Sequence, residues 1–506
     1  MDLFRNPNFV TKYIDFDKYG YQILLTGVLV FLTAIYLSLG KKRKLPPGPY
    51  GIPYIGYFPF LGEKPYETFH KLSKKYGSVF SINLGGHLVV ILNDWESVKE
   101  AFSKAETANR PENFFDIIPN GLGLGGVNGA EWVEQRRFSV KAMKDIGFGR
   151  TRWEELVQEE LKEVVEMMKK HGTAPLDVRK FFTSTFTNNV LTLIFGHRLP
   201  IGHPDTELVS QCVDAVSNSL PSLGLNVFLP KLSDFLTFLG LTRQSLNFET
   251  ILKFTNFATK AIQEKQDKME DSASDSFVDE YVNEIRRNAL KNKETSFSER
   301  HLRGNTQALL IGGSETSRTT LVFILISMAE HQETQKRVQE ELDNVLGKEG
   351  TLRWADRTRV PYTFATIMEA MRWRSVVPIN TLRMTSEDIK ISGYDIPKHT
   401  AIVANNWALH NDPKYWNNPE RFIPERFLLD DGKQVNFKPD SYVPFSFGKR
   451  SCPGELIAMM EILLYFTTLM QKFTVLPEEG QKVKYNTILG LTFQATDVKL
   501  RFIPRG

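Results

Sequence analysis

One segment near the C-terminus combines residue types that could hold a metal-containing cofactor. The sequence FSFGKRSCPG ends at Gly454, and an apolar helical run, Glu455–Met470, follows it. Cys452 would therefore lie just before a helix N-terminus, where the helix dipole and free backbone N–H groups favour thiolate, the form that binds iron. Gly448 would permit a tight turn, Gly454 would let the helix backbone approach a flat macrocycle, and Arg450 offers a cation for its carboxylates.

The same segment carries a family resemblance. Five of its positions match in type and spacing, so that it resembles the haem-binding loop of the cytochrome P-450 family: Phe445, Gly448, Arg450, Cys452 and Gly454. The resemblance implies that Cys452 is the axial ligand of a haem iron in a mainly α fold with a small β region. It also implies a monooxygenase that uses O2 to oxidise a small apolar substrate such as a steroid, a fatty acid or a xenobiotic.

A second segment with chemical potential lies in a predicted long helix, Ser298–His331. Residues 312–316 of this helix read Gly-Gly-Ser-Glu-Thr. Each mid-helix glycine costs about 1 kcal/mol relative to alanine, so the pair either leaves room for another group or allows a close helix crossing. In the resembled family the room holds dioxygen, and Thr316 and Glu315 resemble the alcohol and the acid that deliver protons during oxygen activation.

Two further motifs follow in the order and spacing of the family. Glu369 and Arg372 resemble its Glu-x-x-Arg motif, and Arg426 resembles the arginine of the following meander, which would complete a charge network that fixes the cysteine loop. Taken alone, this spacing is uninformative because an exposed i,i+3 pair has it too. The spacing recurs at Glu134/Arg137 and at Glu284/Arg287.

Candidate partners for the haem propionates come from three places in the chain. Trp132 and Arg136 are one helical turn apart and share a face, as the family's Trp-x-x-x-Arg pair does. Arg383 and Arg450 resemble the other two partners, although many relatives carry histidine where Arg383 stands. For Trp132 alone, core packing is the alternative explanation.

The glycine-rich sequence Gly121–Gly126 matches the Gly-x-Gly-x-x-Gly dinucleotide pattern but lacks its context. A strand should precede this pattern and a helix should open at it, whereas Ile118-Pro119-Asn120 and Val127-Asn128-Gly129 flank it here. We therefore expect a mobile loop and no dinucleotide site, so that electrons from NADPH must arrive through a separate flavoprotein reductase, with cytochrome b5 as a second candidate partner. In the resembled fold several apolar segments would surround the substrate: Phe114, Phe115, Leu220–Leu239, Val377–Ile379 and Ile488–Phe493.

The N-terminus has the features of a membrane anchor. Tyr19–Gly40 is uncharged and its length suits a helix across a bilayer, roughly 20 residues. The basic cluster Lys41–Lys44 should remain cytosolic, which predicts a single-pass protein of the endoplasmic reticulum that contacts membrane lipid. A buried core helix is the alternative. The prolines of Leu45–Pro49 suggest a hinge, so that residues 1–44 would form the anchor and residues 45–506 the catalytic domain.

Composition and periodicity set the frame for these motifs. A net charge of +4 over 506 residues gives no indication of a nucleic-acid partner, and two cysteines indicate a reducing compartment. A polar run, Gln266–Lys293, suggests a solvated surface segment. Amphipathic or apolar patterns predict helices at Glu154–Lys170, Thr206–Ser219, Phe248–Met269, Ser298–His331 and Glu333–Leu346, and strands at Val79–Leu84, Leu88–Leu92 and Thr400–Asn405.

Two other functions use the same cysteine loop. A haem-thiolate isomerase or dehydratase would act on peroxides, and a non-catalytic haem sensor or carrier would only bind the cofactor. Thr316 and Glu315 argue against the first, because peroxide rearrangement needs no proton relay. A stripe of Arg137, Lys141 and Lys144, near Lys449, would suit an acidic reductase or would simply be a solvated helix face.

Overall fold

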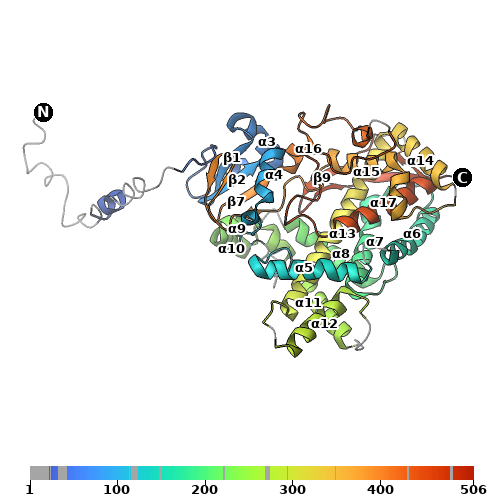
Figure 1. The fold of residues 1–506 in the computed structure, drawn as a ribbon, viewed down its shortest axis with the longest axis horizontal. Coiled ribbons are helices and arrows are strands. Elements are labelled where there is room, and N and C mark those ends of the chain that lie inside the picture. The colour runs from blue at the N-terminus through green and yellow to red at the C-terminus, as the bar shows by residue number, and fades with distance from the viewer. Residues whose placement is uncertain are drawn as a thin grey trace, which may run out of the picture.

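The computed structural model describes residues 22, 24–31, 43–112, 114, 123–147, 151–219, 223–267, 274–292, 294–347, 349–429, 432–478 and 482–505. Helices make up most of the body, and the strands β1, β2 and β7 lie together at the end of the body nearest the N-terminal segment (Figure 1). The predicted class, mainly α with a small β region, is confirmed.

The five predicted helices are all present, with ends that differ by a few residues. The α-helices are α3 Pro65–Tyr76, α4 Trp95–Ser103, α5 Gly129–Asp145, α6 Thr151–His171, α7 Val178–Phe195, α8 Pro204–Ser219, α9 Leu223–Phe228, α10 Pro230–Phe238, α11 Arg243–Asp267, α12 Phe277–Leu290, α13 Glu299–Glu330, α14 Gln332–Leu346, α15 Pro361–Trp373, α16 Asn406–His410 and α17 Glu455–Lys472. Short 3-10 helices are η1 Phe58–Phe60, η2 Ala105–Thr107, η4 Trp354–Arg359 and η5 Pro424–Phe427.

The strands form one four-stranded sheet and three smaller ones. The larger sheet has the order β1-β2-β7-β4, and the others are β3-β11-β8, β9-β10 and β5-β6. The predicted strands correspond to β1, β2 and β7. The strands are β1 Val79–Leu84, β2 His87–Leu92, β3 Leu176–Asp177, β4 Arg383–Met384, β5 Ile389–Ile391, β6 Tyr394–Ile396, β7 Ala401–Ala404, β8 Phe473–Pro477, β9 Asn486–Leu489, β10 Phe493–Thr496 and β11 Lys499–Pro504.

Strand β1 shows how alternation positions this sheet. Phe80, Ile82 and Leu84 point into one apolar cluster, as the period of two predicts, while Val79 belongs to a second cluster. Both faces of the sheet are therefore covered, and this end of the body has its own small cores beside the main helical one.

Helix α13 is the central element of the main core. Ser298 caps it by accepting a hydrogen bond from the backbone N–H of His301, and the helix packs against α7, α8, α11, α15 and α17. Within the described residues, α13 is the one helix long and apolar enough to cross a membrane. It is mostly buried inside the body, which is the position of a core helix.

The sequence-based interpretation of residues 266–293 as a solvated segment is wrong for α12. Ser276 caps this helix, and Phe277, Val278, Tyr281 and Val282 are buried against the core. These apolar residues recur at helical spacing, so polar residues between them line the opposite, solvent-facing side. The helix therefore belongs to the core.

The predicted span Tyr19–Gly40 falls mainly outside the described residues. Within it, residues 24–31 are helical and exposed. Lys41 and Lys42 also lie outside the described residues, whereas Arg43 forms an ion pair with Asp388 at 2.9 Å.

Candidate active site

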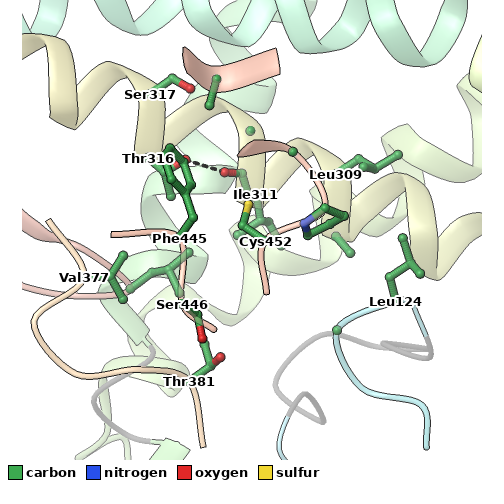
Figure 2. Close-up of a pocket in the computed structure, with 18 of the residues that line it drawn as sticks. Leu124, Leu309, Ile311, Thr316, Ser317, Val377, Thr381, Phe445, Ser446 and Cys452 are labelled. Atoms are coloured by element: carbon green, nitrogen blue, oxygen red, sulfur yellow. Dashed lines mark hydrogen bonds between the residues drawn. The ribbon is translucent and has the colours of Figure 1, made fainter. Parts of the chain in front are cut away.

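A cavity of about 380 Å³ lies between α13 and the loop that precedes α17. Cys452 and Thr316 both line it, and Figure 2 shows them projecting from these two different segments. Val377 and Leu491 line it too, from two of the predicted wall segments. Phe114 and the described part of residues 220–239 do not line the cavity, while Phe115 lies outside the described residues.

The cysteine loop is a compact turn that presents the sulfur to the cavity. Gly448 has φ 76°, and a Cβ there would lie 1.9 Å from the carbonyl oxygen of Phe102, so no side chain fits. The backbone N–H of Cys452 donates to the carbonyl of Phe445 at 2.9 Å, which closes the loop. Gly454 follows as the N-cap of α17, and a Cβ there would lie 3.9 Å from Cys452 Sγ.

The surroundings of the Cys452 thiol oppose its deprotonation, which its position before a helix did not predict. Cys452 presents accessible surface, yet protein surrounds it on nearly all sides, because that surface faces the cavity. Burial raises the pKa of the Cys452 thiol, although the N–H groups of Gly454 and Glu455 and the guanidinium of Arg136 act in the opposite direction. The helix N-terminus alone therefore does not favour the thiolate here, and a metal cation would.

Four arginine side chains, with Trp132 among them, gather beside the cavity. Arg450 lies over the Trp132 ring with its guanidinium carbon 4.0 Å from the ring centroid, and Arg136 lies 5.8 Å from it. Burial, reinforced by the charges of its arginine neighbours, lowers the pKa of Arg450 to about 8, that of Arg383 to about 9 and that of Arg110 to about 10. A cluster of buried cations with depressed pKa values attracts an anion.

The partners of these arginines are neutral. Arg450 donates to the carbonyls of Ala108, Leu124 and Val127 and to Asn128 Oδ1; Arg136 to that of Ser451; Arg110 to those of Gly125, Thr381 and Leu382; and Arg383 to the carbonyl of Phe447 and to Ser446 Oγ. No ion pair among the described residues involves them. Among the residues that the structure describes, Arg383 Nε and Nη1 and Trp132 Nε1 are buried and have no hydrogen-bond partner. Unused donors among unpaired cations fit the carboxylates of a haem.

The two glycines of α13 serve different purposes. A Cβ at Gly312 would meet nothing within 4 Å, because this position faces the cavity. A Cβ at Gly313 would lie 2.8 Å from a methyl group of Val190, which places this glycine at the crossing of α13 with α7. Both glycines and Val190 line the cavity, so Gly312 leaves room in it and Gly313 combines a place at its wall with a close helix crossing. Thr316, one turn further on, donates from Oγ1 to the carbonyl of Gly312 at 2.6 Å (Figure 2).

Glu315 lies next to Thr316 but on another side of the helix. Its carboxyl is fully buried and does not line the cavity. The structure therefore brings Thr316 and Cys452 to one cavity and directs Glu315 elsewhere.

The Glu-x-x-Arg motif forms a buried charge network. Glu369 and Arg372 are both fully buried and make two parallel hydrogen bonds of 2.7 and 2.8 Å, and Arg426 Nε lies 3.1 Å from the same carboxyl. Arg372 also donates to the carbonyl of His410, whose Nε2 accepts from the backbone N–H of Val443. Val443 belongs to the chain that leads into the cysteine loop, so the network supports that loop.

Sequence reasoning missed two residues of this site. Arg110 lines the cavity together with Arg136 and Arg450, whereas Arg383 does not line it, but Arg110 stands in a loop with no periodic pattern to mark it. His410 links the charge network to Val443 and Ser375, and burial lowers its pKa to about 3, which keeps the ring neutral. A histidine before Asn-Asp-Pro gives no such signal in the sequence.

Comparisons with known proteins cover nearly the whole chain. The family model for cytochrome P-450 matches residues 46–502. The chain is 31% identical to cytochrome P-450 2J5 of Mus musculus over 96% of both proteins. It is 32% identical to cytochrome P-450 2U1 of Homo sapiens over 94% of this chain and 92% of that protein. It is also 32% identical to cytochrome P-450 2A6 of Homo sapiens, over 91% and 94% respectively. The chain therefore belongs to the cytochrome P-450 family of haem-thiolate monooxygenases.

Proposed function

We propose that the cavity takes a small apolar substrate and that Cys452 holds the haem iron at which this substrate is oxidised. The bound haem supplies the activation of dioxygen and the insertion of one oxygen atom, with electrons that reach it from NADPH through a separate reductase. One observation carries the assignment of the site. Cys452 Sγ shares its cavity with buried arginines that have no carboxylate partner among the described residues, and a haem has both an iron and two carboxylates.

The side chains around the cavity have different roles. Trp132, Arg136, Arg383 and Arg450, joined by Arg110, would bind the propionates and so fix the orientation of the macrocycle. Phe445, Gly448 and Gly454 shape the loop that presents the sulfur, and Glu369, Arg372 and Arg426 support it from behind. Thr316 holds a hydroxyl proton at the cavity wall, where it can be passed toward the reacting oxygen. The wall between these groups is mostly aliphatic, which favours an apolar substrate.

The ligand assignment is tested with the reduced, CO-bound protein. Thiolate ligation gives a strongly red-shifted Soret band, and Cys452→Ser should lose that band while the fold persists. Retention of the band in this variant would contradict the assignment. Turnover that proceeds in full without O2 and without a reductant would favour the peroxide isomerase over the monooxygenase.

Similarity to the cytochromes P-450 2J5, 2U1 and 2A6 supports an association of this protein with the endoplasmic reticulum membrane. We propose that Tyr19–Gly40 crosses the bilayer once and that Lys41–Lys44 stays cytosolic. Residues 45–506 would then form the catalytic domain. The described part of the span, residues 24–31, presents exposed leucine, valine and phenylalanine side chains. The catalytic body adds exposed apolar residues before α3 and on α10, among them Tyr50, Tyr54, Phe60, Phe235 and Phe238.

On the catalytic body, the segment before α3 and the segment that leads into α10 are neighbours. Phe58 of η1 contacts Phe228 at the end of α9, with 6.3 Å between ring centroids. They would rest on the same membrane surface. Removal of residues 1–40 should reduce membrane association and leave haem binding intact, with residual binding through this surface. Protection of the catalytic domain from protease in sealed microsomes would contradict the proposed orientation.

The proposed reductase surface is the exposed basic stripe of α5. Arg137, Lys141 and Lys144 are all exposed, and so is Lys449 in the cysteine loop. The opposite face of α5 carries Trp132, which is buried beside the arginine cluster. A negatively charged flavoprotein that docks on this stripe would deliver electrons on the side of Cys452, and cytochrome b5 is a second candidate for the same surface.

A further inference from the structure

The carboxyl of Glu315 is directed away from the cavity into a buried polar network. Its Oε1 accepts a hydrogen bond from Gln494 Nε2 at 2.6 Å and another from Thr492 Oγ1, in β10 and directly before it. Ser217 of α8 is a further hydrogen-bond partner. Glu315 therefore joins α13 to α8 and to the β9–β10 hairpin.

A second set of contacts, one helical turn further along α13, ties the same elements together. Arg318 donates to Asp214 of α8 at 2.8 Å and to Thr183 of α7 at 2.9 Å. Arg179 of α7 donates to Asp214 at 3.1 Å and to Gln494 Oε1 at 3.0 Å. Gln494 thus receives a hydrogen bond from α7 through its oxygen and donates to Glu315 through its nitrogen, so the two sets of contacts form one network.

The helical spacing of these residues closes the network. Glu315 and Arg318 are three positions apart on α13, and Asp214 and Ser217 are three positions apart on α8, so each pair lies on one helix face. Connected networks of this kind are stable only when nearly every member is satisfied, because the low dielectric of the interior makes a lost partner costly.

This network lies directly behind the wall of the cavity. Ser217 Oγ accepts a hydrogen bond from the backbone N–H of Leu491 at 3.1 Å and another from Gln494 Nε2 at 3.2 Å. Leu491 and Val216, the neighbour of Ser217, both line the cavity. At Gly490 a Cβ would lie 2.7 Å from Ser217 Oγ, so the hairpin turn approaches α8 as closely as a glycine allows.

We propose that Glu315 is a positioning residue that sets the shape of the substrate wall and is not the proton donor of oxygen activation. By holding Gln494 and Thr492, it fixes Leu491 and Val216 relative to Thr316 on its own helix. These side chains decide which atom of a substrate lies nearest the reacting centre, so Glu315 determines specificity through them. The inference rests on the proposed function, because it concerns the substrate cavity of the haem enzyme.

The protonation of Glu315 supports the same conclusion. Burial raises the pKa of this carboxyl, against the opposing charge of Arg318 and the hydrogen bonds from Thr492 and Ser217. Its Oε2 is buried and has no hydrogen-bond partner in the described part of the chain. A proton released from this group would leave a charge in a fully buried position that has no direct contact with the cavity, which is unfavourable.

The test measures the wall with iron-binding probes of different length. Both 1-methylimidazole and 1-dodecylimidazole bind haem iron through nitrogen, but only the dodecyl chain contacts the cavity wall, so the ratio of their Kd values reports the wall alone. Glu315→Ala should lower the preference for the long probe by about 5- to 150-fold, the range for a buried partner left unsatisfied. Glu315→Gln, which keeps the Oε1 acceptor and removes the ionisable group, should keep the ratio within about twofold.

Two further variants make the result independent of whether Glu315→Ala folds. Thr492→Val removes one donor to Glu315 without changing size, and it should shift the ratio in the same direction as Glu315→Ala. Glu330→Gln removes a carboxyl from the far end of the same helix, where it pairs with Arg374 at 3.5 Å, and should leave the ratio unchanged. An unchanged ratio in Thr492→Val would overturn the proposal.

Turnover provides the second readout. Product formed per NADPH should survive in Glu315→Gln for any compound that the wild type oxidises. A loss of coupling in Glu315→Gln as large as that in Thr316→Ala would assign proton transfer to Glu315 and overturn the positioning role. Failure of the proposed function would be seen in a different measurement. The wild-type protein would then lack the red-shifted CO band of thiolate ligation, whatever the variants show.

Discussion

Replacement of Arg372 by alanine should destabilise the protein strongly, whereas the same change at Arg287 should have little effect. Both arginines pair with a glutamate three residues earlier on a helix, but they differ in burial and in the number of further hydrogen-bond partners. The Glu369–Arg372 pair has no exposed side-chain surface, while the side chain of Arg287 is 55% exposed. The comparison therefore shows what a buried, fully hydrogen-bonded context adds to one sequence pattern.

The magnitude follows from what each truncation leaves behind. Arg372→Ala leaves the carboxylate of Glu369 buried with only Arg426 as a charged partner, and it removes the donor from the carbonyls of His410, Pro419 and Arg421. Breaking a buried pair in this way costs about 3–5 kcal/mol. A pair at the surface with an exposed arginine, such as Glu284–Arg287, contributes about 0–1 kcal/mol. Against a total stability of about 5–15 kcal/mol, the first loss is a large fraction.

The assay is a urea titration followed by two signals, helical circular dichroism and the red-shifted Soret band of the reduced CO complex. The Soret signal should fail first in Arg372→Ala, because the network reaches the cysteine loop through His410 and Val443. Arg372→Lys should lie between the two extremes, since lysine keeps the charge but not the paired hydrogen bonds. Equal midpoints for Arg372→Ala and Arg287→Ala would refute the reasoning.

Two other predictions concern single residues, and a third concerns a pair of residues. Thr316→Ala should leave haem and substrate binding intact but divert NADPH into peroxide or water, which product per NADPH measures; unchanged coupling would remove its role in proton delivery. Arg137→Glu with Lys141→Glu should slow reductase-supported turnover and lessen its salt dependence while a peroxide-driven assay stays near wild type, and equal losses in both assays would mean that these residues support the haem site. Burial raises the pKa of Glu461 from 4.5 to about 8, so the folded state holds this proton more tightly than the unfolded state. The stability that the protonated carboxyl contributes is therefore lost as the pH rises from about 4.5 to about 8. Glu461→Gln should therefore be stabilising relative to wild type at pH 8 and much less so at pH 5 in urea unfolding, and an equal difference at both values would contradict the shift.

Elements with a strong period or a rare residue type could be predicted from the sequence. The helix α13 and the strands β1, β2 and β7 follow their apolar patterns closely, since burial enforces the period. The turn at Gly448 was also predictable, because its positive φ and its close approach to Phe102 both require glycine. Helix α12 was missed because its average composition is polar, although its buried residues recur at helical spacing.

The directions in which neighbouring side chains of one short motif point could not be predicted from the sequence. Gly312 and Gly313 are adjacent, chemically identical and both at the cavity wall, but a Cβ would find open space at Gly312 and would lie 2.8 Å from Val190 at Gly313. Glu315 and Thr316 diverge for the same reason, since neighbours on a helix point about 100° apart and only one of them can face a given partner. Which of the two faces the cavity depends on the rotation of α13, and packing against α7 and α8 fixes that rotation.

The electrostatics of the cavity give a reason why this fold needs its cofactor. Burial disfavours the charged form of every ionisable group, so it opposes the thiolate of Cys452 and the guanidinium of Arg450 alike. A single charged protein group cannot stabilise both charges. A carboxylate placed near the sulfur would repel the thiolate, and a further cation placed near the arginines would repel the guanidinium groups. A haem relieves both, since its iron is cationic at the centre and its propionates are anionic at the edge. Occupation of the cavity should therefore stabilise the cysteine loop and the arginine cluster together, in proportion to how tightly the folded state binds haem.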